Sequence, residues 1–422
     1  MPTLSESRFL RLLTLCLLYL AQGLPWGFVT YTLAAWFAGQ GMSEGELGAA
    51  LGITSLPWTF KFLGGPVIDR WTLPKLGRRR PWILLAQGMM LLTILAILAV
   101  PDLVANLKLL VALLFLHNVF SALQDVAVDA LAVDILPEHE RGTANGLMYG
   151  SKYLGGAVGG AGLAKVMAAS GLQQAILVQG AVLLFILLFP LFLREGGHSA
   201  AKAEEAAERG ILENLTLLLR AFRLRSPFLG GIYAVLSTSA AGALGVIATV
   251  FYVQHLGWGD TAYAEFAGGP ALLMGLLGAF LGGLLADLVG RKVVVIGGST
   301  LLGLSWIAFA LCEPYWTNLL VVKGFLLAEP LIMSMMAGGF FALCTDLSLP
   351  AIAATQFTAY MALSNLSTSL GQMLGGQVRG LADEYTTLFI GAGILQILVG
   401  MVLLPVDPLQ ARRALGEDEG EA

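Results

Sequence analysis

Long apolar runs follow one another along most of this chain, separated by short polar segments. A helix needs about 20 apolar residues to cross the ~30 Å hydrocarbon core of a bilayer. Twelve such runs are present: 12–38, 46–68, 81–100, 108–135, 143–169, 173–193, 228–254, 264–288, 292–312, 318–346, 355–381 and 386–404. The pattern predicts an all-α membrane protein with twelve transmembrane helices.

The sixth and seventh runs are separated by a long polar stretch, residues 194–226. It divides the chain into an N-terminal six-helix bundle (1–193), a cytoplasmic linker (194–226), a C-terminal six-helix bundle (227–404) and an acidic cytoplasmic tail (405–422). Apolar residues between Ile211 and Phe222 recur at helical spacing. This segment is either an amphipathic helix lying on the membrane surface or a packed connector, and both interpretations stay open.

Composition supports a bilayer environment. Hydrophobic residues make up 57% of the chain and charged residues 12%, whereas soluble domains are roughly 25% charged. These values exclude a soluble fold and a disordered chain. The three cysteines have no metal-binding spacing and no nucleotide-binding loop is present, so we expect neither a metal nor another cofactor and no nucleic-acid partner.

Lysine and arginine set the orientation, because they are enriched in cytoplasmic loops. If the N-terminus is cytoplasmic, 18 of the 24 lysines and arginines fall in cytoplasmic segments. Both termini are therefore predicted to be cytoplasmic, and we expect a bacterial inner membrane protein.

The two halves share an internal repeat. Asp69 ends the second run and Asp287 ends the eighth, 218 positions later, and each follows a glycine by four residues. Farther along, Pro137 and Pro350 are 213 positions apart, since the first half has five extra residues in one loop. Two six-helix repeats in the same orientation are typical of one class of secondary transporter.

The repeated motif resembles the signature of the major facilitator superfamily. In the first half it is formed by Gly65, Asp69, Arg70, Gly77, Arg78 and Arg79, and in the second by Gly283, Asp287, Gly290, Arg291 and Lys292. The first half is also similar to the muropeptide permease (AmpG-type) and acetyl-coenzyme A transporter branch, through the segments 22–25, 60–63 and 124–130. The resemblance implies the major facilitator fold and transport by alternating access.

Charged residues that recur in both halves are expected to serve the scaffold. The resemblance implies that they form a cytoplasmic gate, which holds the halves together when that side is closed. Its predicted members are Asp69, Arg70, Arg78, Arg79, Asp134, Asp287, Arg291, Lys292 and Asp346.

Four charged residues inside the runs have no counterpart in the other half. Asp125 and Asp129 are four residues apart and share one helix face. Charged groups within a bilayer are costly, so each is a functional candidate, and this pair is predicted to couple transport to protons. Lys61 and Lys152, with Gln124 beside the pair, are predicted to bind an anionic substrate. Alternatively, a lysine fixes and neutralises the carboxylates.

Further candidates are weaker. His117 and Glu329 are repeat-equivalent at an offset of 212 and are predicted to form an outer gate or proton path. Gln22, Trp26 and Tyr31 in the first run are predicted to line a substrate cavity, although ordinary helix packing explains them equally well.

The function expected from these features is secondary active transport driven by a proton gradient. The predicted substrate is a bulky anionic solute such as an anhydromuropeptide, imported with protons by a monomer in the lipid bilayer. Acetyl-coenzyme A or another anionic conjugate is the alternative. A membrane-embedded enzyme is a weaker alternative, because it leaves the repeat unexplained and because His117 lies about 12 Å along the helix from Asp125.

Overall fold

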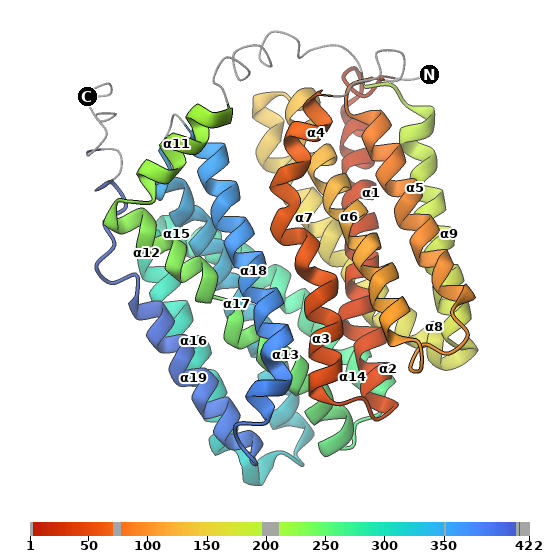
Figure 1. Cartoon of the computed structure of the whole chain (residues 1–422), viewed down its shortest axis with the longest axis vertical. Helices are drawn as coiled ribbons and strands as arrows, with labels where there is room; N and C mark the ends of the chain where they lie inside the picture. Colours follow the sequence, from red (N-terminus) through yellow and green to blue (C-terminus); the bar gives the residue numbers. More distant parts are fainter. Residues whose placement is uncertain (1–2, 71–76, 196–210, 350–351, 411–412, 414–422) are drawn as a thin grey trace. The chain divides into compact units, whose positions relative to one another are not determined.

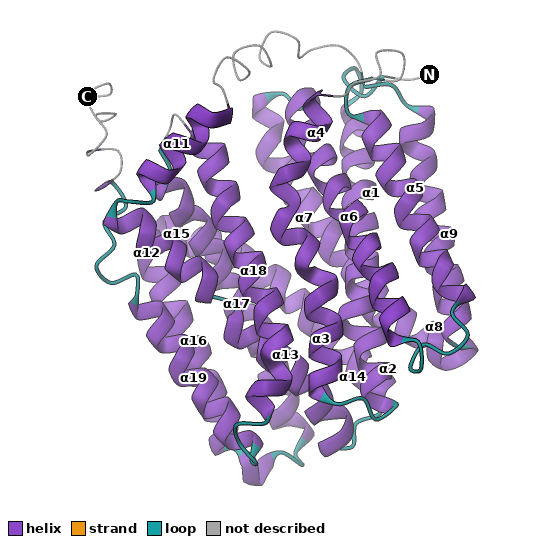
Figure 2. Cartoon of the chain, in the orientation of Figure 1, coloured by secondary structure: helices purple, strands orange, loops and turns teal. Residues whose placement is uncertain are grey.

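The computed structural model describes residues 3–70, 77–195, 211–349, 352–410 and 413. In these ranges the chain forms helices joined by turns and loops, and Thr3 and Arg194 pair in an isolated bridge (Figures 1 and 2). Within these described ranges, eight helices are long and apolar enough to cross a membrane. The prediction of an all-α membrane protein is therefore confirmed for the described residues.

The chain separates into two compact units. The first comprises Met1–Ser43, Ile53–Ala206 and Thr249–Leu273, and the second comprises Glu44–Gly52, Ala207–Ala248 and Met274–Ala422. The first unit thus contains segments of the predicted C-terminal bundle. The predicted division at 194–226 stays a prediction.

Most helices of the first unit derive from the first six runs. They are α1 (Arg8–Gly27), η1 (Phe28–Leu33), α2 (Ala34–Gly39), η2 (Leu56–Leu63), α4 (Gly64–Arg70), α5 (Arg80–Ala96), η3 (Ile97–Ala99), α6 (Leu107–Ile135), η4 (Glu138–Glu140), α7 (Arg141–Ala157), η5 (Val158–Gly162), α8 (Leu163–Ser170) and α9 (Leu172–Phe192). The later helices of this unit are η6 (Phe251–His255), α14 (Asp260–Phe266) and η7 (Ala267–Ala271). Helix α3 (Glu44–Ser55) has residues in both units.

The second unit contains the remaining helices. They are α11 (Ile211–Ala221), α12 (Arg225–Leu236), α13 (Ser239–Val250), α15 (Leu272–Val289), α16 (Arg291–Leu311), η8 (Glu313–Tyr315), α17 (Leu319–Leu347), α18 (Ala353–Arg379) and α19 (Tyr385–Met401). The ends of α13 and α15 reach into the first unit.

The two motif glycines that precede α5 and α16 have the same conformational role. Gly77 has φ 109° and Gly290 has φ 96°. Side chains other than glycine rarely adopt this left-handed backbone, which reverses the chain before each helix. The repeat thus preserves glycine where the backbone requires it.

Four π-helical segments in the first unit interrupt helices that the hydropathy pattern predicts as continuous. They are η1, η5, η6 and η7, and η5 packs against both η1 and η7. The Thr32 hydroxyl in η1 donates to the carbonyls of Gly159 (2.8 Å) and Gly160 (2.6 Å) in η5. A Cβ atom built on Gly160 would lie 2.7 Å from Gly268 Cα in η7, so this crossing depends on glycine.

Helix α11 contacts α18 in the second unit. Ala221 is buried in a small cluster with Leu349 and Ile352, and Leu217 and Leu218 pack partly against it. These contacts favour the packed-connector interpretation for the end of the linker. Residues 196–210 of the predicted linker and 414–422 of the predicted tail lie outside the described residues.

Candidate functional site

Lys61 and Asp125 form an ion pair within the first unit. The Nζ atom of Lys61 lies 2.9 Å from Oδ2 of Asp125, and the two side chains are only 12% and 5% exposed. Lys61 is in η2, which contacts α6. The structure thus brings together two of the predicted site residues and pairs them, which is the arrangement of the neutralising alternative.

Asp129 is one helical turn from Asp125 but has a different partner. The hydroxyl of Tyr19 in α1 donates a hydrogen bond to Oδ1 of Asp129. The ring of Tyr149 in α7 lies 5.8 Å from that of Tyr19, edge to face. Among the described residues, no cationic side chain lies within ion-pair distance of Asp129, although Lys61 is within electrostatic range.

Lys152 in α7 is the second predicted cation of the site. Its Nζ atom lies 4.9 Å from the centroid of the Trp58 ring, a cation–π distance. The Trp58 ring is oriented by a 2.8 Å hydrogen bond from its Nε1 to Oδ1 of Asn118. In the described part of the chain, no carboxylate lies within ion-pair distance of Lys152, and its interaction with Asp125 is longer-range.

Trp26, Tyr31 and Tyr153 form an aromatic cluster. Trp26 is 39% exposed, and its ring lies 6.2 Å from that of Tyr31 and 6.3 Å from that of Tyr153. Tyr153 directly follows Lys152 in α7. The predicted residues Trp26 and Tyr31 therefore belong to one aromatic cluster, and Trp26 gives this cluster partly exposed apolar surface.

The two predicted glutamines are buried in the helix bundle. Gln124 is 0% exposed and its Nε2 donates to Oε1 of Gln87 in α5. Gln22 is 1% exposed, and within the described part of the chain neither of its amide atoms has a hydrogen-bond partner. Neither glutamine is as accessible to a solute as Trp26.

His117 and Glu329 each contact a neighbouring helix of their own unit. The His117 Nδ1 lies 3.1 Å from both Thr93 Oγ1 and the Met90 carbonyl on α5. The Trp306 Nε1 on α16 donates to Glu329 at 3.1 Å. The outer gate that these two residues were predicted to form stays a prediction.

The predicted gate residues form ion pairs within each unit. Arg79 pairs with Asp134 at 3.0 Å in the first unit, and Arg291 pairs with Asp346 in the second. Lys292 donates to two backbone carbonyls, those of Leu404 and Val406.

The remaining gate residues have other surroundings. Glu195 accepts hydrogen bonds from the backbone N–H groups of Arg78 and Arg79. Arg70 and Asp287 are exposed, and the side chain of Asp69 lies outside the described part of the chain. A latch between the halves therefore stays a prediction.

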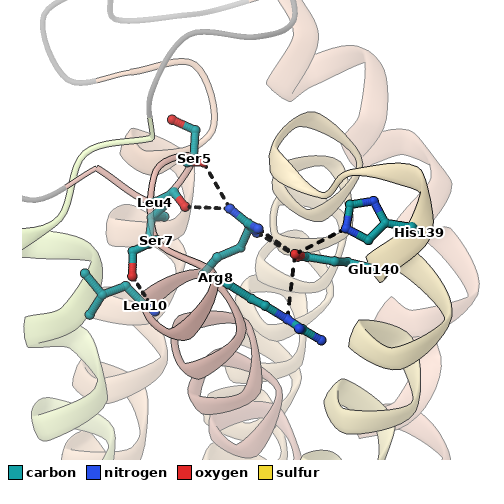
Figure 3. A network of polar contacts seen from close by, with 8 residues as sticks. Leu4, Ser5, Ser7, Arg8, Leu10, His139 and Glu140 are labelled. Atoms are coloured by element: carbon teal, nitrogen blue, oxygen red, sulfur yellow. Dashed lines mark hydrogen bonds and ion pairs between the residues drawn. The ribbon is translucent and has the colours of Figure 1, made fainter.

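A polar network at the start of α1 involves Glu140 in η4 (Figure 3). Arg11 donates to Glu140 Oε2 from two nitrogens, at 3.2 and 2.7 Å, and its third donor reaches the carbonyls of Leu4 and Ser5. These hydrogen bonds from Arg11 hold the pKa of the Glu140 carboxyl below its usual value. The network ties the first helix to the segment that precedes α7.

Sequence reasoning missed Tyr19, Tyr149, Trp58 and Tyr153. Three of them are spaced one turn from a predicted residue: Tyr19 from Gln22, Trp58 from Lys61, and Tyr149 from Lys152. Helical periodicity could have found these three. Among the described residues, no three His, Cys, Asp or Glu side chains gather as a metal site.

Comparison with known proteins identifies the family. The chain matches the Major Facilitator Superfamily over residues 15–371 and belongs to it. The protein is therefore an integral membrane transporter, not an enzyme.

Two solved structures show the same fold. The D-xylose-proton symporter has a TM-score of 0.74 at 14% identity, covering 96% of this chain and 99% of that one. The nucleoside transporter NupG has a TM-score of 0.70 at 15% identity, covering 93% and 98%.

Individual relatives place the chain more narrowly. The anhydromuropeptide permease of Escherichia coli strain K12 is 27% identical over 398 residues, which cover 93% of this chain and 78% of the permease. The transporter AmpG 4 of Rickettsia conorii is 23% identical over 295 residues, 68% of this chain and 70% of that protein. The predicted resemblance to the AmpG-type branch is confirmed.

Proposed function

We propose that this transporter imports a bulky anionic solute of the anhydromuropeptide type together with protons. We further propose twelve spans, both termini in the cytoplasm, and insertion in a bacterial inner membrane. The similarity to the Escherichia coli permease over most of the chain supports the substrate class. Acetyl-coenzyme A or another anionic conjugate is the alternative substrate.

The observation that carries the proposal is the unequal pairing of four charged groups in the first unit. Asp125 is paired with Lys61 at 2.9 Å, whereas Asp129 accepts a hydrogen bond from the neutral Tyr19 hydroxyl. A carboxylate without a cationic partner has a high free energy inside a membrane, and binding a proton lowers that free energy. Asp129 is therefore the proposed proton-binding group.

Lys152 is the proposed anion-binding group. It lies over the Trp58 ring, which attracts a cation without neutralising it. An anionic group of the solute would supply the full counter-charge that this lysine lacks among the described residues. The neighbouring aromatic cluster of Trp26, Tyr31 and Tyr153 would contact the less polar parts of the same solute.

The proposal accounts for coupling in physical terms. Protonation of Asp129 removes a negative charge near Lys61 and Lys152, so both lysines become more attractive to an anion. Release of the proton restores the carboxylate, which competes electrostatically with the bound anion. Proton binding and anion binding therefore favour each other, and this is the requirement for symport.

Uptake of a labelled anhydromuropeptide into proteoliposomes tests the proposal. An inward proton gradient is expected to stimulate uptake by the unmodified protein. Asp129→Asn is expected to lose this stimulation while still exchanging labelled for unlabelled solute without a gradient. Asn118→Ala is a control, because it alters the Trp58 hydrogen bond and leaves all four charges in place.

Three results would each contradict one part of the proposal. Uptake that ignores the gradient in the unmodified protein would remove proton coupling. Normal gradient stimulation in Asp129→Asn would assign the proton to another group. Uptake of acetyl-coenzyme A instead of the muropeptide would keep the coupling and replace the substrate class.

A further inference from the structure

Four helices of the first unit each place one glutamine in the bundle interior. Gln22 of α1, Gln87 of α5, Gln124 of α6 and Gln179 of α9 are all at most 1% exposed. Each of α1 and α5 packs against both α6 and α9. Glutamine is mostly an exposed residue in proteins, so four fully buried ones in one bundle require a physical reason.

Part of this set is connected directly. Gln124 donates to Gln87, and Gln87 donates to the Leu183 carbonyl of α9 at 3.3 Å. Gln179 is one helical turn before Leu183, so its side chain leaves α9 on the same face. These contacts bring the interior faces of α5, α6 and α9 together.

Gln22 belongs to the same level of the bundle. It is one turn after Tyr19, whose hydroxyl bonds to Asp129, and α1 and α6 run in opposite directions. Moving one turn from Tyr19 to Gln22 along α1 therefore corresponds to moving one turn from Asp129 to Asp125 along α6. Gln22 thus lies at the depth of Gln124 and Asp125. Along its helix, Gln22 is about 21 Å from the start of α1, and Gln179 about 20 Å from the end of α9.

Among the described residues, five amide atoms of this set have no hydrogen-bond partner. They are Nε2 and Oε1 of Gln22, Nε2 and Oε1 of Gln179, and Oε1 of Gln124. Among the described residues, exchanging the amide oxygen and nitrogen supplies the missing partners for Gln377, but not for Gln22 or Gln179. Buried polar groups in proteins are almost always hydrogen-bonded, to ordered water where no protein group is in reach.

We propose that the interior of this helix group is an internal water-binding site formed by Gln22, Gln124 and Gln179. Three amides from three helices offer both donors and acceptors, and a buried water makes about three such bonds. Gln124 directly precedes Asp125, so the water would lie beside the carboxylate pair but inside the bundle. The proposal does not depend on the solute or on proton coupling.

Whether a glutamine substitution raises or lowers the melting temperature tests the proposal. Gln179→Met keeps the side-chain size and removes both amide atoms. If the site binds water, the substitution removes a partner of that water, and the melting temperature of the purified transporter is expected to fall by ~2 °C or more. If the interior is dry, the substitution removes two unsatisfied groups and the melting temperature rises, which would overturn the proposal.

Gln356→Met provides a matched control in the other unit. Gln356 is also 0% exposed, but its amide bonds to the Leu349 N–H and the Leu347 carbonyl, each at 3.0 Å. The melting temperature of the Gln356→Met variant is expected to fall whether or not the glutamine site of the first unit binds water. The size of this fall shows what the loss of one hydrogen-bonded buried amide costs.

An experimental density map of the unmodified protein gives a second test that needs no variant. At a resolution that shows ordered water, about 2 Å, density within hydrogen-bond distance of at least two of the three amides supports the site. Dry space between them, or direct amide-to-amide contact that satisfies all five atoms, overturns it.

Discussion

The ion pair between Lys61 and Asp125 allows a quantitative prediction by a double-substitution cycle. The pair is 2.9 Å long with side chains 12% and 5% exposed, so neither charge can be solvated once its partner is removed. Removing one member of a buried ion pair costs about 3–5 kcal/mol, because the other charge stays buried. Lys152 and Asp129 lie within electrostatic range and compensate in part, so we expect the lower end of this range for Lys61→Met and for Asp125→Leu.

The double variant is expected to behave differently from the sum of the single variants. Replacing both members of a buried pair by apolar groups of similar size is often neutral, because the desolvation cost disappears with the charges. The free energy of unfolding of Lys61→Met/Asp125→Leu should therefore exceed the additive value by about 2 kcal/mol or more. Unfolding by sodium dodecyl sulfate in mixed micelles measures the free energy of unfolding of the unmodified protein, the two single variants and the double variant.

Additivity within about 0.5 kcal/mol would refute this reasoning, because residues that do not interact give additive effects. The pair Lys165 and Glu265 serves as a control. It is 3.8 Å long with side chains 68% and 37% exposed, and exposed pairs couple by less than about 1 kcal/mol.

Two further predictions concern the first unit outside the charged site. Glu140→Gln should lower the melting temperature at pH 7 and have a smaller effect below about pH 4. The lowered pKa of Glu140 means that this carboxyl stabilises the fold only while it is ionised. A melting-temperature difference between variant and unmodified protein that stays constant from pH 7 to 3 would contradict this. Gly160→Ala should lower the melting temperature, because its Cβ would lie 2.7 Å from Gly268 Cα, whereas Gly162→Ala in the same π-helical segment meets only ordinary 3.6 Å contacts. Equal effects of the two alanines in thermal unfolding would show that the crossing can adjust.

The sequence predicted the helical class, and it left a lysine that neutralises the carboxylates as the alternative to anion binding. Apolar run length indicates a spanning helix directly. A lysine within a membrane has few possible partners, which is why pairing with the carboxylates was the alternative to substrate binding. The π-helical segments were not predicted, because a single inserted residue leaves the hydropathy pattern almost unchanged.

The hydrogen bond from Tyr19 to Asp129 could not be predicted for a different reason. Tyrosine is common in helix cores and carries no charge, so nothing in its type marks it as a partner. Its position one turn from Gln22 was visible, but the direction of its side chain depends on how α1 packs on α6.

The second half of the chain provides an internal comparison for the charged site. The repeat aligns Lys61 with Ala279 and Gln124 with Met336. In the second unit, Met336 accepts through its sulfur from Ser299 at 3.2 Å and from Gln396 at 3.5 Å. A thioether and an alanine thus occupy positions that are a glutamine and a lysine in the first half.

This comparison separates what the fold needs from what the site needs. Helices α15 and α17 form without a lysine–aspartate pair at the repeat-equivalent positions. Helices in the second half are therefore compatible with apolar and weakly polar side chains at these positions. Such side chains cost less free energy in a membrane than charged ones. At these positions the first half carries the free-energy cost of buried charges and the second half does not, and the proposed role in binding or coupling would account for that cost.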